Sequence, residues 1–135
     1  MAIKMSVAVR NARLDAIETA IGTSAVLKIR SGAPPTNIAD ADSGTVGATM
    51  NLASDWMNAA SAGSKTKLGT WQDASADAAI TAGHFRLYAS DGTTQHMQGT
   101  VTGTGGGGDM ELDNTNIAAA QQVNVTTFTL TDGNA

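Results

Sequence analysis

The chain contains no cysteine. This absence excludes disulfide frameworks, thiolate zinc sites and thiol catalysis, although it does not identify a compartment. Proline is rare as well, with two residues, and aromatic side chains make up only 4% of the chain. The core must therefore be built from aliphatic residues, methionine and a few rings. A core this thin favours additional burial against partner subunits.

Positive charge is scarce and scattered. Eight lysine and arginine residues stand against twelve acidic residues, which gives a net charge of −4. Phosphate binding needs clustered basic residues, so we expect no nucleic-acid partner. The closest approach to a basic patch is Lys65 and Lys67, which we interpret as a solvated strand face.

Long apolar runs are also missing. No segment approaches the roughly 20 apolar residues that a membrane-spanning helix needs. The first residues, "MAIKMSVAVRNARLDA", are basic but lack the apolar stretch and cleavage site of a signal peptide. We therefore expect neither a membrane partner nor a secretion signal.

One helix is predicted over residues 8–22. Leu14, Ile17 and Ile21 are spaced three and four apart and form one stripe, and Gly22 ends the helix. We expect this stripe to pack on the sheet or on a neighbouring subunit, so its three residues are candidate subunit contacts. Residues 1–7 would form an N-terminal arm and residues 23–135 a single β domain.

After the helix the apolar period changes to two. Several short alternating segments separated by glycine-rich turns predict a mostly β fold. The expected architecture is an antiparallel β-sandwich or jelly-roll-like barrel with one N-terminal α-helix. Near Thr126 and Thr127 the alternation slips by one residue, which predicts a bulge or bend.

A hairpin is predicted over residues 83–101. A three-residue loop at 90–92 would place Phe85 opposite Met97, with Gly92 in the left-handed position. The remaining hairpin side chains would form a wetter opposite face: His84, Arg86, Tyr88, His96 and Gln98.

The stretch "VTGTGGGGDMELD", residues 101–113, matches the dinucleotide-binding pattern G-x-G-x-x-G. That pattern needs a helix after it, so that the helix N-terminus holds the pyrophosphate. Here an acidic strand follows, and acidic side chains repel phosphate. We therefore interpret residues 103–108 as a mobile hairpin loop.

Two groups of residues carry side chains that can bind a metal ion. Asp109, Glu111 and Asp113 alternate along one strand face and are calcium candidates, although the EF-hand pattern fails at Asn114. His84 and His96 would share a hairpin face, but no third zinc ligand is evident. A solvated acidic strand and exposed histidines explain both patterns, so we expect no cofactor.

Catalytic and sugar-binding patterns are equally sparse. No serine stands in G-x-S-x-G, and no catalytic residue is predicted, so we expect a protein that is not an enzyme. Trp56 and Trp71 could stack on sugar rings, but in a chain with so few aromatics they are better explained as core.

Four segments together resemble a group of small proteins encoded in tailed-bacteriophage and prophage genomes. They are "LDAIETAIGTSAVLKIRSGAPP", "GTWQDASADAAITAGHFRLYASDGTT", "QGTVTGTGGGGDMELDNTNI" and "VNVTTFTLTDGNA". The resemblance covers most of residues 14–135. It implies a virion component and transfers no catalytic motif.

The leading interpretation is a capsid decoration (cement) protein that stabilises the shell. Its partners would be the major capsid protein or tail proteins and further copies of itself, in a virion assembled in the bacterial cytoplasm. The alternatives are a tail or head–tail connector component and a glycan-binding surface module. We further expect deletion of residues 1–13 to abolish particle binding and leave a folded domain.

Overall fold

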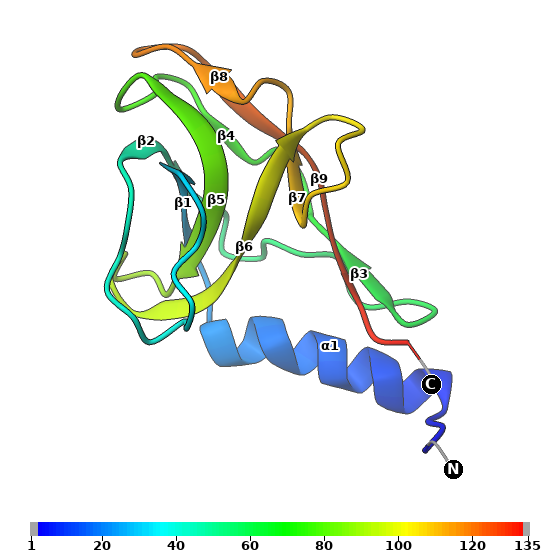
Figure 1. The fold of residues 1–135 in the computed structure, drawn as a ribbon. Helices are drawn as coiled ribbons and strands as arrows, with labels where there is room; N and C mark the ends of the chain where they lie inside the picture. The colour runs from blue at the N-terminus through cyan, green and yellow to red at the C-terminus, as the bar shows by residue number, and fades with distance from the viewer. Residues whose placement is uncertain (1–2, 134–135) are drawn as a thin grey trace.

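A computed structural model describes residues 3–133, so residues 1–2 of the expected arm and 134–135 of the expected β domain lie outside it. Residues 3–133 form one helix followed by nine strands (Figure 1). The elements are α1 (Val7–Ile21), β1 (Val26–Ser31), β2 (Val46–Asn51), β3 (Ser64–Thr66), β4 (Gln72–Asp73), β5 (Ile80–Tyr88), β6 (Gln95–Gly103), β7 (Met110–Leu112), β8 (Asn116–Ile117) and β9 (Val123–Thr131). The predicted class, mostly β with one N-terminal helix, is confirmed.

All nine strands belong to one curled sheet. Its main path runs β2-β1-β5-β6-β7-β9-β3, while β4 pairs with β9 and β8 pairs with β5. The curl brings β2 close to β4, because Thr49 of β2 donates its backbone N–H to the carboxylate of Asp73 in β4 and its hydroxyl to the carboxylate of Asp77. The finer expectation of an antiparallel sandwich is not confirmed, because β6 and β7 run parallel within this single sheet.

The helix forms where its sequence predicts it. The Ser6 hydroxyl accepts a hydrogen bond from the Val9 N–H and caps its N-terminus. Gly22, at a φ of 94°, ends it and donates its N–H to the Glu18 carbonyl. No helix in residues 3–133 is long and apolar enough to span a bilayer.

The core lies inside the curl and is organised around four rings. Trp56 contacts Trp71 at 6.0 Å between ring centroids, and Phe128 contacts both Trp71 and Phe85 at 5.5 Å. Tilted and edge-on pairs of this kind stabilise a core beyond the area that they bury. Aliphatic residues and methionines from β1, β2, β5 and β7 surround these rings.

In the hairpin of β5 and β6 the predicted pairing of odd with odd residues is confirmed, but the strands are shifted by two residues from the predicted register. Odd residues do face odd residues, but Leu87 lies opposite Met97 and Phe85 opposite Gly99. A bulge after Leu87 and a longer loop over residues 89–94 account for the difference, and Gly92 has the expected left-handed φ of 70°.

The predicted slip in the last strand is confirmed. Leu112 of β7 pairs with Val125 and Glu111 pairs with Thr127, so Thr126 is left over as a bulge. This extra residue turns both Val125 and Phe128 into the core, although one number is odd and the other even.

Residues 103–108, which we call the glycine segment, do not form the expected hairpin. This segment doubles back along the edge of β6 until the Asp109 carboxylate accepts hydrogen bonds from the N–H and hydroxyl of Thr100. The next strand, β7, therefore starts beside Val101 and runs parallel to β6.

Candidate functional site

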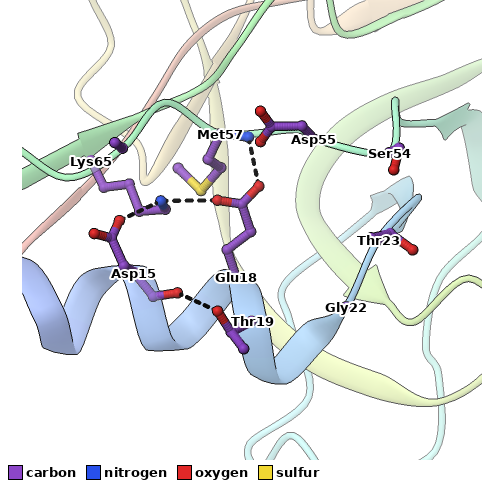
Figure 2. Close-up of a pocket in the computed structure, with 10 residues that line it drawn as sticks. Asp15, Glu18, Thr19, Gly22, Thr23, Ser54, Asp55, Met57 and Lys65 are labelled. Carbon is purple, nitrogen blue, oxygen red and sulfur yellow. Dashed lines mark hydrogen bonds and ion pairs between the residues drawn. The ribbon is translucent and has the colours of Figure 1, made fainter.

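A groove of about 560 Å³ lies between the C-terminal half of α1 and the segment that follows β2 (Figure 2). Its lining comprises Asp15, Glu18, Thr19, Gly22, Thr23, Ser54, Asp55, Met57, Ala59 and Lys65. Lys65 projects from β3 between the carboxylates of Asp15 and Glu18, and its Nζ lies 2.8 and 2.9 Å from their oxygens.

A polar stripe of α1 builds one wall of this groove. Asn11, Asp15, Glu18 and Gly22 follow each other at helical spacing, and each accepts a hydrogen bond from residues 56–63. Glu18 alone accepts the backbone N–H groups of Trp56 and Met57. These acceptors satisfy N–H groups of residues 56–63, a segment that has little regular secondary structure to do so itself.

The expectation that Lys65 belongs to a solvated face is wrong, because its side chain is only 2% exposed. Burial works against its charge, but the hydrogen bonds from Lys65 to Asp15 and Glu18 outweigh this and raise its pKa. The same hydrogen bond from Lys65 lowers the pKa of Asp15. Burial opposes the charge of Glu18 too, yet bonds from Lys65, Met57 and Trp56 lower its pKa.

These pKa directions define what the groove can do chemically. A nucleophilic or basic lysine needs a depressed pKa, and a carboxyl acid needs a raised one. Here the pKa of Lys65 is raised and the pKa values of Asp15 and Glu18 are lowered, so all three side chains stay charged near neutral pH. The ion pairs of Lys65 with Asp15 and Glu18 therefore fasten α1 to the β domain electrostatically.

A second ionic cluster lies on the face of β1 and β5 that points away from the core. Asp42, in the loop after β1, accepts hydrogen bonds from Arg30, Arg86 and Tyr88 at 2.7, 2.8 and 2.8 Å. Arg86 also binds the carbonyls of residues 37 and 40 and the side chain of Gln98. Burial opposes the charge of Asp42, but the bonds from Tyr88 and Arg86 lower its pKa.

The expectation of a wetter hairpin face is therefore wrong for three of its five residues. His84, Arg86 and Tyr88 are buried, because residues 32–45 fold over this side of the sheet. The turn at Pro35 contributes directly, since its carbonyl accepts a hydrogen bond from Gln98 at 2.6 Å.

His84 is the least satisfied member of this covered face. Its Nδ1 lies 2.8 Å from the Gly32 carbonyl, while its buried Nε2 has no hydrogen-bond partner. Burial lowers the pKa of His84, and the neighbouring Arg30 and Arg86 lower it further. His96 lies at the exposed outer end of β6. The two histidines are thus not brought together as a zinc pair.

The glycine segment does cradle an anion, and that anion belongs to the chain itself. The Glu111 carboxylate accepts the N–H groups of Gly105 and Gly107 at 3.1 Å each, and the hydroxyl of Thr127 at 3.2 Å. The two backbone N–H bonds lower its pKa. Both glycines have positive φ, which only glycine adopts easily, so the arrangement depends on them.

The three calcium candidates are used separately. Asp109 is bonded to Thr100, Glu111 to the glycine segment, and Asp113 to the backbone and side chain of Asn124. Within residues 3–133 no group of three His, Cys, Asp or Glu side chains is placed to hold a metal ion. Donors of the chain thus occupy the oxygens that calcium would need.

The candidate subunit contacts lie mainly inside the chain. Leu14 and Ile21 are buried, and Ile17 is half-buried against the core. Of the two expected roles for this stripe, packing on the chain's own sheet is the one that the structure shows. The apolar surface left on α1 lies instead at its start, where Val7 and Val9 are 45% and 47% exposed.

The two tryptophans are core, as expected. Trp56 donates its indole N–H to the Gly22 carbonyl, and Trp71 donates to the carbonyls of Trp56 and Leu68. Neither ring face is open to a sugar, because both side chains are almost fully buried. Stacking on these tryptophans therefore cannot form the basis of a glycan site.

Comparison of the chain with protein-family models, with curated proteins and with solved structures finds no match.

The residues that sequence reasoning missed are the ionic ones: Asp15, Glu18, Lys65, Arg30, Asp42 and Arg86. One signal was available, since Asp15 and Glu18 share a helical stripe with Asn11 and Gly22. The partners of Arg30 and Arg86 leave no comparable local pattern, because the acceptors lie in an irregular loop.

Proposed function

We propose that this chain is a non-enzymatic structural protein of a tailed-bacteriophage virion, and specifically a capsid decoration protein that stabilises the shell. The observation that carries the proposal is the apolar surface at the start of the chain. Ile3, Val7 and Val9 are 83%, 45% and 47% exposed, and we call them the N-terminal patch. Exposed apolar side chains near one end of a chain are candidates for contact with a partner.

The disposition of the charged groups supports a binding role. The charged groups around Lys65 and Asp42 form ion pairs within the chain and hold the fold together. Lys65 has a raised pKa and Asp15 and Glu18 have lowered pKa values, the directions expected of fixed ion pairs. The resemblance of residues 14–135 to phage-encoded proteins supplies the setting.

A small patch is sufficient for a decoration protein. Each contact can be weak, since many copies bind a lattice that repeats the same site. A ligand that binds only the assembled shell shifts the equilibrium towards that shell by mass action. The shell is therefore expected to withstand heat and low ionic strength better with the protein bound.

The structure changes how the N-terminal region has to be tested. Deleting residues 1–13 would remove contacts that the domain needs, because Arg10 binds the Asp132 carbonyl and Asn11 accepts the Gly63 N–H. The first thirteen residues are therefore not a dispensable arm. Point substitutions in the N-terminal patch avoid this problem.

The experiment is co-sedimentation of the purified protein with capsids that lack it. We expect the Val7→Asp/Val9→Asp variant to lose binding at least roughly ten-fold, since two charges would enter an apolar contact. Ile38→Asp is the matched control, because Ile38 is 38% exposed on the loop after β1. Full binding by the Val7→Asp/Val9→Asp variant would contradict the proposal.

A further inference from the structure

The curled sheet contains an unfilled strand position between β6 and β9. The short strand β7 joins these two strands only at residues 101–103 of β6 and 125–128 of β9. Beyond it β6 pairs only with β5, over residues 95–100, and β9 pairs only with β3, over Thr129–Thr131. In Figure 1 the two strands diverge below β7.

A groove of about 510 Å³ separates the two diverging edges, and we call it the seam. Residues of β5, β6 and β9 line it, together with the two residues that precede β7: Phe85, Met97, Gln98, Gly108, Asp109, Thr127, Phe128, Thr129 and Leu130. Met97 and Leu130 face inward from opposite sides and are only half-buried. The floor of the seam is thus apolar, and its outer rim is polar.

Backbone groups on both edges point into the seam. The Phe128 carbonyl accepts the Lys67 N–H, and the Asp132 N–H binds the Gly63 carbonyl, so even-numbered residues here face β3. Peptide groups alternate along a strand, and those of Thr129 therefore face the seam. On β6 the Thr100 N–H points away from β5, towards Asp109, so the same alternation turns Gln98 into the seam.

Unpaired strand edges invite a further strand, because their free backbone N–H and C=O groups form a template for pairing with another chain. Over these residues neither edge has a ladder partner on the seam side, within the part of the chain that the structure describes. An extended segment laid in the seam would continue the position of β7 and bond to both neighbours. This is recognition by strand addition.

The chain carries a segment of matching pattern. Ile3-Lys4-Met5 repeats the apolar–charged–apolar order of β7, in which Met110 and Leu112 are buried and Glu111 faces outward. The segment Ile3–Met5 precedes the cap residue Ser6 in neither helix nor strand, and Ile3 is 83% exposed. Extended in the seam, it would direct Ile3 onto the apolar floor and Lys4 towards the rim that contains Asp109.

We propose that the seam binds the N-terminal segment of a second copy of this chain as an added strand. The chain's own segment leaves the far end of α1 and points away from the sheet (Figure 1). Three residues extend at most about 11 Å, which favours a neighbour's seam. Reciprocal exchange closes a dimer, and one-way exchange closes a ring. This self-association does not depend on a role in virions.

Disulfide trapping tests the proposal cleanly, because the native chain has no cysteine. Single variants Ile3→Cys and Met97→Cys are purified separately, mixed and oxidised. Only a contact between copies can join them. The control replaces Met97→Cys by Ala119→Cys, an exposed position next to β8 at the opposite end of the molecule from α1 (Figure 1).

We expect the Ile3→Cys/Met97→Cys product to form at least roughly ten times faster than the control product, since docking raises the local concentration of the two thiols. By light scattering, the native chain should be oligomeric and Ile3→Asp monomeric, with unchanged tryptophan fluorescence. Equal trapping rates, or an oligomer that persists in Ile3→Asp, would overturn the proposal. If the native chain forms the trapped product but does not bind virions, the self-association stands and the proposed function is rejected.

Discussion

Asp42 is expected to be the most important single carboxylate of the fold. It lies between two arginines whose side chains are 8% and 0% exposed, Arg30 and Arg86, and it also accepts the Tyr88 hydroxyl. Asp42→Asn keeps the shape and one acceptor oxygen but removes the negative charge. Two buried cations are then left with neutral partners alone.

The magnitude follows from the burial of the partners. Breaking a buried ion pair from one side costs about 3–5 kcal/mol, because the remaining charge stays desolvated. The Asp42 side chain is itself 32% exposed, so water compensates in part and we expect a loss of about 2–4 kcal/mol. A chain of this length has an unfolding free energy of about 7–20 kcal/mol, so the loss is readily measured.

Urea unfolding followed by tryptophan fluorescence is a suitable assay, because Trp56 and Trp71 are both buried. Asp40→Asn is the matched control. Asp40 is an exposed carboxylate in the same loop that accepts the Asn37 N–H. Adding Arg30→Met to Asp42→Asn should recover part of the loss by removing one stranded cation. The reasoning fails if Asp42→Asn costs no more than Asp40→Asn.

Two further predictions concern protonation and the glycine segment. Burial holds the pKa of His84 below its ordinary value of 6.5, so the unfolded chain takes up the proton first and stability falls as the pH drops through 6.5. His84→Asn should remove this part of the pH dependence in thermal melts between pH 7.5 and roughly pH 5, whereas the exposed-site variant His96→Asn should retain it. Glu111→Ala should speed amide hydrogen exchange at Gly105 and Gly107, whose N–H groups lose their acceptor. Unchanged protection at both glycines would show that the carboxylate does not hold the segment.

The parts of the fold that sequence could predict are those with a local period. The stripe of Leu14, Ile17 and Ile21 and the terminator Gly22 predict α1 to within one residue. The change of phase at Thr126 predicts the bulge in β9, because side chains alternate strictly along a strand. Each of these features is settled by neighbours a few residues away.

The parts that could not be predicted depend on contacts across long stretches of chain. Lys65 resembles a surface lysine until Asp15, fifty residues earlier, is placed beside it. Arg86 resembles a solvated strand residue because nothing local shows that the loop containing Asp42 covers it. For the same reason the parallel course of β7 was missed, since hairpins are the usual connection between short neighbouring strands.

The proposed function and the proposed self-association depend on different residues near the start of the chain. The first needs Val7 and Val9 to bind the shell, and the second needs Ile3 to reach a neighbouring seam. Substitutions at these positions can be combined, because none of the three side chains is buried in the single chain. A variant that loses only one property would assign each residue its role.

Quantitative mass spectrometry of purified virions tests the central claim most directly. Under the proposed function a phage genome encodes this chain, and the chain is counted relative to the major capsid protein in virions of that phage. A decoration protein is expected at about one copy per capsid subunit, or one per few subunits. A total of a few dozen copies would contradict decoration and favour a tail or connector component. Absence from the particle would reject a structural role in the virion altogether.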